Sequence, residues 1–262
     1  GTLDPGVSGV LTVMIGKAVR LAPLLLSEEK EYVCLIRLHR DVAPPRIREI
    51  LAEFTGRIYQ RPPRKSAVAR NLRIRVVHEI DLLDALDRYL LIRVRCDAGT
   101  YVRSLCHHIG LALGSGAHMV ELRRIRSGHF DETRACTLHD LEDAASAARQ
   151  GNPEVLKSLI LSPGAALISL PVVVIRDTAV DAVCHGALLA RPGLSRYDEF
   201  KKGETVVLTS IQGELVALGR TLISSKEAGL LKNGLVISPS TVFMDPGTYP
   251  RGWKKRDHAL SP

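Results

Sequence analysis

Three long stretches in which apolar and polar residues alternate constrain the fold of this chain more than any other feature. They are residues 32–39, 72–80 and 89–96. Such alternation is typical of strands with one buried and one exposed face. Helical patterns lie among them: 44–54 opens on two prolines and precedes Gly56, and 102–113 precedes Gly114. These elements predict an α+β domain built on a mixed sheet.

The pattern changes near Leu170 and Pro171, after a helix start that Thr137 and Asp140 indicate. Short strand-like stretches then alternate with turn residues: 172–175, 205–209, 214–219 and 235–237. A segment of about 80 residues with this pattern suits a small β-barrel-like module. We therefore predict a first domain over residues 1–170, a β-rich domain over 171–250 and a polar tail over 251–262.

The 262 residues carry a formal net charge of +8, and part of this excess is clustered. One basic group lies within residues 57–75, and a second consists of Arg123, Arg124 and Arg126. Clustered cations suit a polyanionic partner because they release counterions from phosphates. For the stretch 60–70 we predict RNA-phosphate contacts, although a solvated basic loop explains it equally well. The residues concerned are Arg61, Arg64, Lys65 and Arg70.

The five cysteines lie far apart and form no CxxC pair. This argues against a disulfide framework or a zinc site and favours a reducing compartment. His107 and His108 are neighbours on a predicted helix and do not share a face, so we interpret them as ordinary helix residues and expect no metal. No apolar run approaches the roughly 20 residues of a membrane helix, so we expect no membrane association.

The opening segment GTLDPGVSGVL offers a reactive carboxylate at Asp4. Pro5 biases Asp4 toward extended backbone, while Gly6 and Gly9 permit a tight loop and close approach of a ligand. A carboxylate on such a loop can act as a nucleophile or general base. An ordinary Asp-Pro turn is the alternative, and the spacing alone favours it.

Two further residues suit a pocket around such a carboxylate. Arg103 falls in the first turn of the predicted helix, where a cation opposes the helix dipole and calls for an anion. Asp4 is one candidate for that anion. A solvated Arg103 on the surface, or an Arg103 paired with the nearby Asp97, is the alternative, and the position of Arg103 alone favours this alternative. Tyr32 stands at the head of a predicted strand and can stack on a base, although a tyrosine there more often belongs to a core.

Five segments occur in the order found in one family: GTLDPGVSGVL, KEYVC, QRPPRKSAVAR, DAGTYVRSLCHHIG, and ELRRIRSG with TLHDLEDA. On these segments the sequence resembles TruB-type pseudouridine synthases. Later segments resemble the PUA domain of the dyskerin branch: LPVVVIRDTAVDAVCHGALLARPG, ELVALGRTLIS and VFMDPGTYPRGW. Within that branch the sequence is similar to the catalytic subunits of archaeal H/ACA ribonucleoproteins. The resemblance covers nearly all of the chain, and GTLDP together with GTYVR is its specific part.

The resemblance implies a role for each matching residue. Asp4 matches the catalytic aspartate, taken here as the nucleophile, and Arg103 matches the arginine that pairs with it. Tyr32 matches the tyrosine that stacks on the target uracil. Three residues match the surroundings of the substrate pocket: Tyr101, Leu122 and Lys30. Whether Asp4 attacks the base, attacks the sugar or removes a sugar proton stays open.

The implied reaction is isomerisation of uridine in RNA to pseudouridine, for which we expect no cofactor. The implied partners are substrate RNA, an H/ACA guide RNA that selects uridines in ribosomal RNA, and small H/ACA core proteins.

A standalone enzyme for the T-loop uridine of transfer RNA is one alternative, and a noncatalytic RNA-binding scaffold is an alternative of another class. The implied location is the cytoplasm of an archaeon, or the nucleolus of a eukaryote. The family carries a His and a strand ahead of the position of Gly1, so we expect part of the first domain to be missing.

Overall fold

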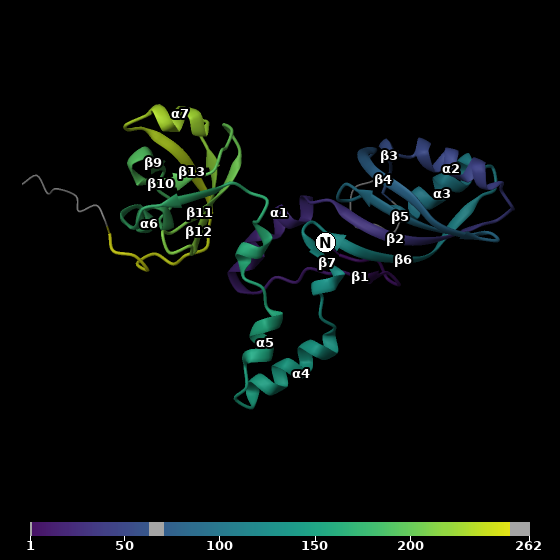
Figure 1. Ribbon diagram of the computed structural model, residues 1–262, viewed down its shortest axis with the longest axis horizontal. Helices are drawn as coiled ribbons and strands as arrows, with labels where there is room; N and C mark the ends of the chain where they lie inside the picture. The colour runs from purple at the N-terminus through teal and green to yellow at the C-terminus, as the bar shows by residue number, and fades with distance from the viewer. Residues whose placement is uncertain (1, 63–70, 252–262) are drawn as a thin grey trace, which may run out of the picture. The chain divides into compact units, whose positions relative to one another are not determined.

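The computed structural model describes residues 2–62 and 71–251, which form two compact units (Figure 1). The first unit holds the residues up to Ile15 together with Leu21–Leu159. The second holds Gly16–Arg20 together with the chain from Ile160 onward. Each unit has its own hydrophobic core. In the described part of the chain no helix is long and apolar enough to cross a membrane.

A largely antiparallel sheet is the frame of the first unit. Its strand order is β1-β6-β2-β5-β4-β3, with β7 paired to β6 and only β1 running parallel to its neighbour. The strands are β1 Ser8–Gly9, β2 Lys30–Leu38, β3 Gly56–Gln60, β4 Arg73–Leu86, β5 Tyr89–Cys96, β6 Ala117–Ser127 and β7 Phe130–Asp131. The strands β6, β2, β5 and β4 each pair with a neighbour on both sides, so the residues of β6 and β2 lie inside the sheet and not at its edges.

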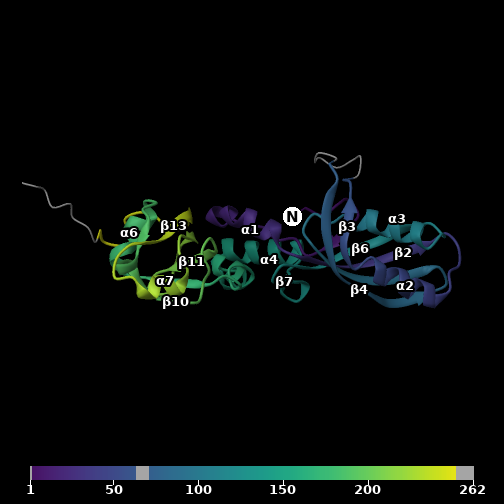
Figure 2. The ribbon, with the colours of Figure 1, turned by 90° about the horizontal axis from the view of Figure 1, so that it is seen from above.

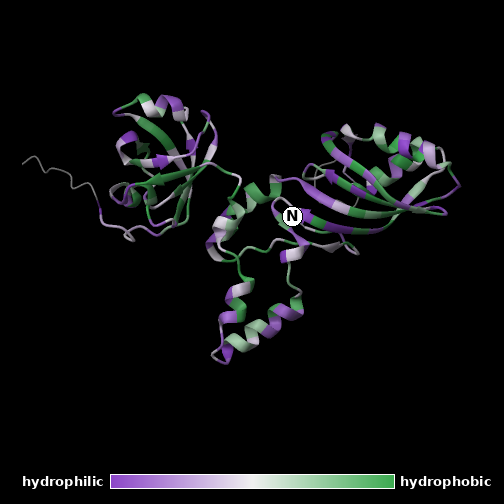
Figure 3. Ribbon diagram, viewed as in Figure 1, coloured by the Kyte–Doolittle hydropathy of each residue, from purple (hydrophilic) through white to green (hydrophobic). Residues whose placement is uncertain are grey.

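Two helices, α2 (Pro44–Glu53) and α3 (Val102–Ala112), lie side by side on one face of this sheet (Figure 1; Figure 2). Alternate residues of β2 and β5 face them and are at most 1% exposed: Cys34, Ile36, Leu38, Leu90, Ile92, Val94 and Cys96. The alternation of hydrophobic and hydrophilic residues is visible along the strands (Figure 3). The burial of one strand face therefore fixes the register of the sheet.

Short helices make up the rest of the first unit. They are α1 Ala22–Ser27, η2 Glu132–Arg134, α4 Leu138–Arg149 and α5 Glu154–Leu159. The predicted start of α4 is confirmed, because Thr137 and Asp140 form a reciprocal capping box. The 3-10 helix η1 (Gly16–Leu21) leads into α1, and most of its residues belong to the second unit.

The second unit is a β-rich module with the strand order β10-β8-β11-β12-β13-β9. Its strands are β8 Val172–Ile175, β9 Leu189–Ala190, β10 Leu194–Tyr197, β11 Thr205–Thr209, β12 Leu215–Thr221 and β13 Leu235–Val242. Its helices are η3 Pro163–Ala166, α6 Asp177–Cys184, η4 Arg191–Gly193 and α7 Ser225–Leu230. The predicted α+β class is confirmed.

Candidate active site

Asp4 lies on an exposed loop that leads into β1. The backbone N–H of Val7 donates to the Asp4 carbonyl at 3.0 Å, so the chain turns just after Asp4. β1 then pairs with β6, with Gly9 opposite Arg124. A Cβ on Gly9 would lie 2.1 Å from the Arg124 carbonyl oxygen, so only glycine allows this approach.

Arg124 fastens the Asp4 loop to β6. Its side chain is buried, although Arg123 and Arg126 beside it are exposed. Its Nε donates to the Val10 carbonyl at 2.7 Å and its Nη1 to the Thr2 carbonyl at 3.4 Å. The sequence suggested one basic group of three arginines and missed this role. The available signal was the spacing, since Arg124 stands two residues after the buried Leu122 and so on the same strand face.

Tyr32 is the direct cross-strand partner of Arg124 between β2 and β6. Its half-buried ring packs against the core, and its side chain is hydrogen-bonded to Arg124. Burial raises the pKa of the Tyr32 phenol, the charge of Asp4 adds to the rise, and Arg124 opposes it. The phenol is therefore neutral at physiological pH, and Asp4 lies within its electrostatic reach.

Tyr101 and Arg103 stand at the beginning of α3. Gln60 holds the Tyr101 backbone from both sides, since its Nε2 donates to the carbonyl at 3.1 Å and its Oε1 accepts from the N–H at 2.9 Å. Gln60 is 2% exposed and was not predicted as part of the site. Arg103 is exposed, and among the described residues it forms no ion pair with Asp4. That pairing stays a prediction.

The two remaining pocket candidates are buried. Lys30 is 5% exposed, and its ammonium group donates to the carbonyls of Leu25, Leu26 and Glu28 at 3.0, 3.4 and 2.7 Å. These carbonyls close the C-terminal end of α1, so Lys30 holds α1 against β2. Leu122 lies in the core opposite Cys34. Both side chains thus support the strands that carry Tyr32 and Arg124.

The predicted phosphate contacts are described in part. Arg61 is exposed beside the end of β3. Arg64, Lys65 and Arg70 lie outside the described residues. The prediction of an RNA-facing loop therefore rests on the sequence.

The cysteine thiols near the site are poor competitors of Asp4 as nucleophiles. Burial raises the pKa of the Cys96 thiol to about 12, which keeps it protonated. Cys34 and Cys106 lie within the core, with their Sγ atoms 3.4 Å apart. Within residues 2–62 and 71–251 no three His, Cys, Asp or Glu side chains gather as a metal site.

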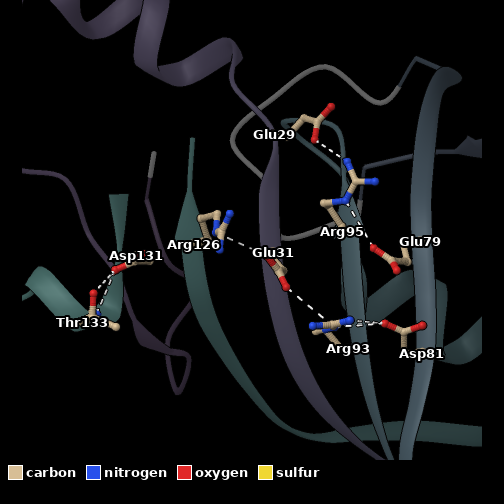
Figure 4. Close-up of polar contacts among 9 residues, drawn as sticks. All are labelled: Glu29, Glu31, Glu79, Asp81, Arg93, Arg95, Arg126, Asp131 and Thr133. Carbon is tan, nitrogen blue, oxygen red and sulfur yellow. Dashed lines mark hydrogen bonds and ion pairs between the residues drawn. The ribbon is translucent and has the colours of Figure 1, made fainter. Parts of the chain in front are cut away.

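The face of the sheet that points away from α2 and α3 carries a row of charged side chains (Figure 4). Glu31 lies 3.4 Å from Arg126 and 3.8 Å from Arg93, and Arg93 donates to Asp81 at 2.6 and 3.0 Å. Arg95 bridges Glu29 and Glu79 in the same way. A cavity of about 330 Å³ opens at this end of the sheet, lined by Glu29, Lys30, Glu31, Arg95, Arg126 and Gly128. Acids and bases alternate here, so this face offers RNA phosphates no uniformly positive surface.

Comparisons with known proteins decide the family. Residues 1–45 match the N-terminal domain of the TruB family of pseudouridylate synthases, and residues 103–167 match the C-terminal domain of tRNA pseudouridylate synthase B. Residues 171–243 match the PUA domain. A curated protein of Methanothermobacter thermautotrophicus named Probable tRNA pseudouridine synthase B is 50% identical over 97% of this chain and 79% of its own length.

This chain belongs to the TruB family of pseudouridine synthases. A second relative of the same name, from Methanocaldococcus jannaschii, is 47% identical over 98% of this chain and 77% of its own length. Both relatives come from archaea. The predicted family and enzyme class are therefore confirmed.

Solved structures similar to this TruB-family chain come from H/ACA ribonucleoproteins. A chain of an H/ACA complex bound to a substrate RNA containing 2′-deoxyuridine has a TM-score of 0.88 and 44% identity, over 97% of this chain and 78% of that one. A chain of a Cbf5-Nop10-Gar1 complex has a TM-score of 0.86 and 47% identity, over 95% and 77%. The predicted resemblance to the dyskerin branch is confirmed.

Proposed function

We propose that this pseudouridine synthase isomerises uridine within RNA, with Asp4 as the nucleophile and Tyr32 stacked on the uracil. One observation carries the proposal: Arg124 on β6 contacts both the loop that carries Asp4 and leads into β1, on one side of β6, and Tyr32 on β2, on its other side. The charge of Asp4 acts on the neutral Tyr32 phenol, which supports a single site that contains both side chains. Arg103, Tyr101, Leu122 and Lys30 complete the candidate site as pairing and supporting residues.

The reaction needs no redox change. The bond between N1 and C1′ breaks, the uracil turns, C5 bonds to C1′, and the C5 proton leaves while N1 gains one. The target nucleotide must leave the RNA stack to reach Asp4, which costs least where the RNA is already single-stranded. Tyr32 can hold the flipped uracil by stacking, a contact worth about 1–3 kcal/mol.

We further propose that the chain works as the catalytic subunit of a guide-dependent complex in the cytoplasm of an archaeon. The similarity to a subunit of an H/ACA complex bound to substrate RNA supports this. A guide RNA then selects the target uridine, and proteins such as the Nop10 and Gar1 of the similar complex assemble with the chain. The module over 171–250 serves as its RNA-binding PUA domain and follows the catalytic domain over 1–170 in the sequence.

A standalone enzyme acting on transfer RNA is the second candidate. The curated relatives support it, because they are named as probable tRNA pseudouridine synthases. The two candidates share the chemistry and differ in whether a guide RNA is needed.

The deciding experiment is tritium release from C5-labelled uridine, in ribosomal and transfer RNA substrates, with and without guide RNA and partner proteins. We expect guide-dependent release by the wild-type chain. Asp4→Asn should lower the rate at least about a thousandfold, since an amide cannot replace a nucleophilic carboxylate.

Each contrary result has a clear meaning. Guide-independent release on transfer RNA would favour the standalone enzyme. Unchanged release by the Asp4→Asn variant would refute Asp4 as the nucleophile. If the assembled complex releases no tritium, a noncatalytic scaffold takes the place of the proposed enzyme.

A further inference from the structure

Arg124 lies on β6, the strand between β1, which follows the Asp4 loop, and β2, which carries Tyr32. Gly9 of β1 is its partner on one side, and Tyr32 of β2 is its partner on the other. Its side chain is 2% exposed, whereas the side chains of Arg123 and Arg126 are more than half exposed. Arg124 is therefore not part of a solvated basic surface.

The Arg124 guanidinium joins both ends of the loop that carries Asp4. It donates to the carbonyls of Thr2 and Val10, which stand on either side of Asp4 in the sequence. The N–H of Val10 donates in return to the Arg124 carbonyl at 2.8 Å. A loop tied at both ends loses conformational freedom before substrate binds, and this holds the Asp4 carboxylate in place.

The same guanidinium is hydrogen-bonded to the side chain of Tyr32. A buried cation is costly unless its donors are satisfied, and here the partners are two loop carbonyls and a phenol. Arginine suits this position because its planar group presents five donors in fixed directions, while a lysine ammonium is a single point charge.

We infer that Arg124 is a positioning residue for the isomerisation, which sets the Asp4 loop and Tyr32 relative to each other and does not itself touch the RNA. This inference rests on the proposed function for its kinetic consequence. Its structural content, a loop clamped by one buried guanidinium, holds independently of the reaction.

The kinetic test compares Arg124→Gln and Arg124→Lys with wild type in the assembled complex. We expect kcat to fall about 100-fold for Arg124→Gln and at least about tenfold for Arg124→Lys, with KM for RNA changed less than about threefold. Arg93→Gln is the matched control, since Arg93 also makes side-chain bonds within this sheet but on its opposite face. Its kcat should stay within about twofold of wild type.

A second measurement does not depend on activity. Amide hydrogen exchange over residues 5–12 should rise at least about tenfold in Arg124→Gln and stay unchanged in Arg93→Gln, while the amides of β5 keep their protection in both. This result shows a local release of the loop, as distinct from general unfolding. It can be obtained even if the wild-type chain proves inactive.

Three outcomes would overturn the inference. One is wild-type kcat in either Arg124 variant. Another is a rise in KM with a reduced salt dependence of RNA binding, which would make Arg124 a phosphate contact. The third is unchanged exchange over residues 5–12. If Arg124→Gln does not fold, Arg124→Lys, which keeps the charge, decides by the same measurements.

Discussion

At the scale of single residues, two glycines of the Asp4 loop are required for different structural reasons. Gly6 and Gly9 both have positive φ, at 79° and 106°. A Cβ on Gly6 would meet nothing within 4 Å, while a Cβ on Gly9 would meet the Arg124 backbone. The loop therefore needs Gly6 for its conformation alone, and it needs Gly9 for both conformation and space.

Gly9→Ala should accordingly displace β1 from β6. We expect a loss of activity of at least about tenfold and a cost in unfolding free energy of about 1–3 kcal/mol, because backbone strain and a clash combine. Gly6→Ala is the control, with a cost near 1 kcal/mol from strain alone. Activity assays and denaturant unfolding of both variants test this. Equal effects of the two substitutions would contradict a separate need for space at Gly9.

At the scale of elements, the strand that the sequence failed to predict is central to the site. β5, β8 and β11 were predicted to the residue, but β6 was not predicted at all. Its alternation is broken by bulges against β2, and its buried face includes the polar Arg124 and Ser127. Alternation identifies a strand only where its inner face is apolar and its pairing regular.

The candidate site shows the same limit. The order of the motifs correctly indicated the family, and the motifs themselves singled out Asp4 and Tyr32 as candidates. They missed Gln60 and Arg124, whose importance comes from contacts with carbonyls far away in the sequence. Helix α6 (Asp177–Cys184) was also missed within a region that was interpreted as strands.

The junction between α1 and β2 contains an ionisable group in an unfavourable place. Glu28 ends α1, and in the described part of the chain its buried Oε2 has no hydrogen-bond partner. Burial raises the pKa of the Glu28 carboxyl above its ordinary value of 4.5, although His129 and Lys30 oppose the rise. The folded chain therefore binds this proton more tightly than the unfolded chain does.

The pH dependence follows from the sign of this shift. The stabilising contribution of the protonated Glu28 is fully present below pH 4.5 and is lost as the pH rises through the raised folded-state pKa. Glu28→Gln has no proton to lose, so its Tm should exceed that of wild type at neutral pH, with the gap closing below pH 4.5. Thermal unfolding against pH tests this. Glu29→Gln, which breaks an exposed pair with Arg95, should give no such gain.

At the scale of the whole molecule, the second unit is not continuous in the sequence. Most of the second unit comes from the chain after Ile160, but the unit also includes Gly16–Arg20. Lys17 donates to the Phe243 carbonyl at 3.0 Å and pairs with Asp245 at 2.6 Å, and Arg20 donates to the Val242 carbonyl. A short segment next to the catalytic loop thus completes the β-rich unit.

Lys17→Met should weaken the second unit and leave the first unchanged. The expected loss is at most about 1 kcal/mol, because the ion pair is largely exposed. Amide exchange of β13 compared with β2 and β5 measures it. Lys157→Met, which breaks an exposed pair within the first unit, is the control. Equal effects on both sheets would contradict a separate second unit.

The divided second unit has a consequence for folding during synthesis. Lys17 and Phe243 are 226 positions apart. At a synthesis rate of roughly 5–20 residues per second, Lys17 is made about 10–45 s before Phe243. The first unit has by then received its last residue, Leu159, and can fold around a segment that still awaits the rest of its own unit. In a nascent chain whose synthesis stops before Val242, the sheet of the first unit would be complete, while Gly16–Arg20 would still lack its binding partners in the second unit.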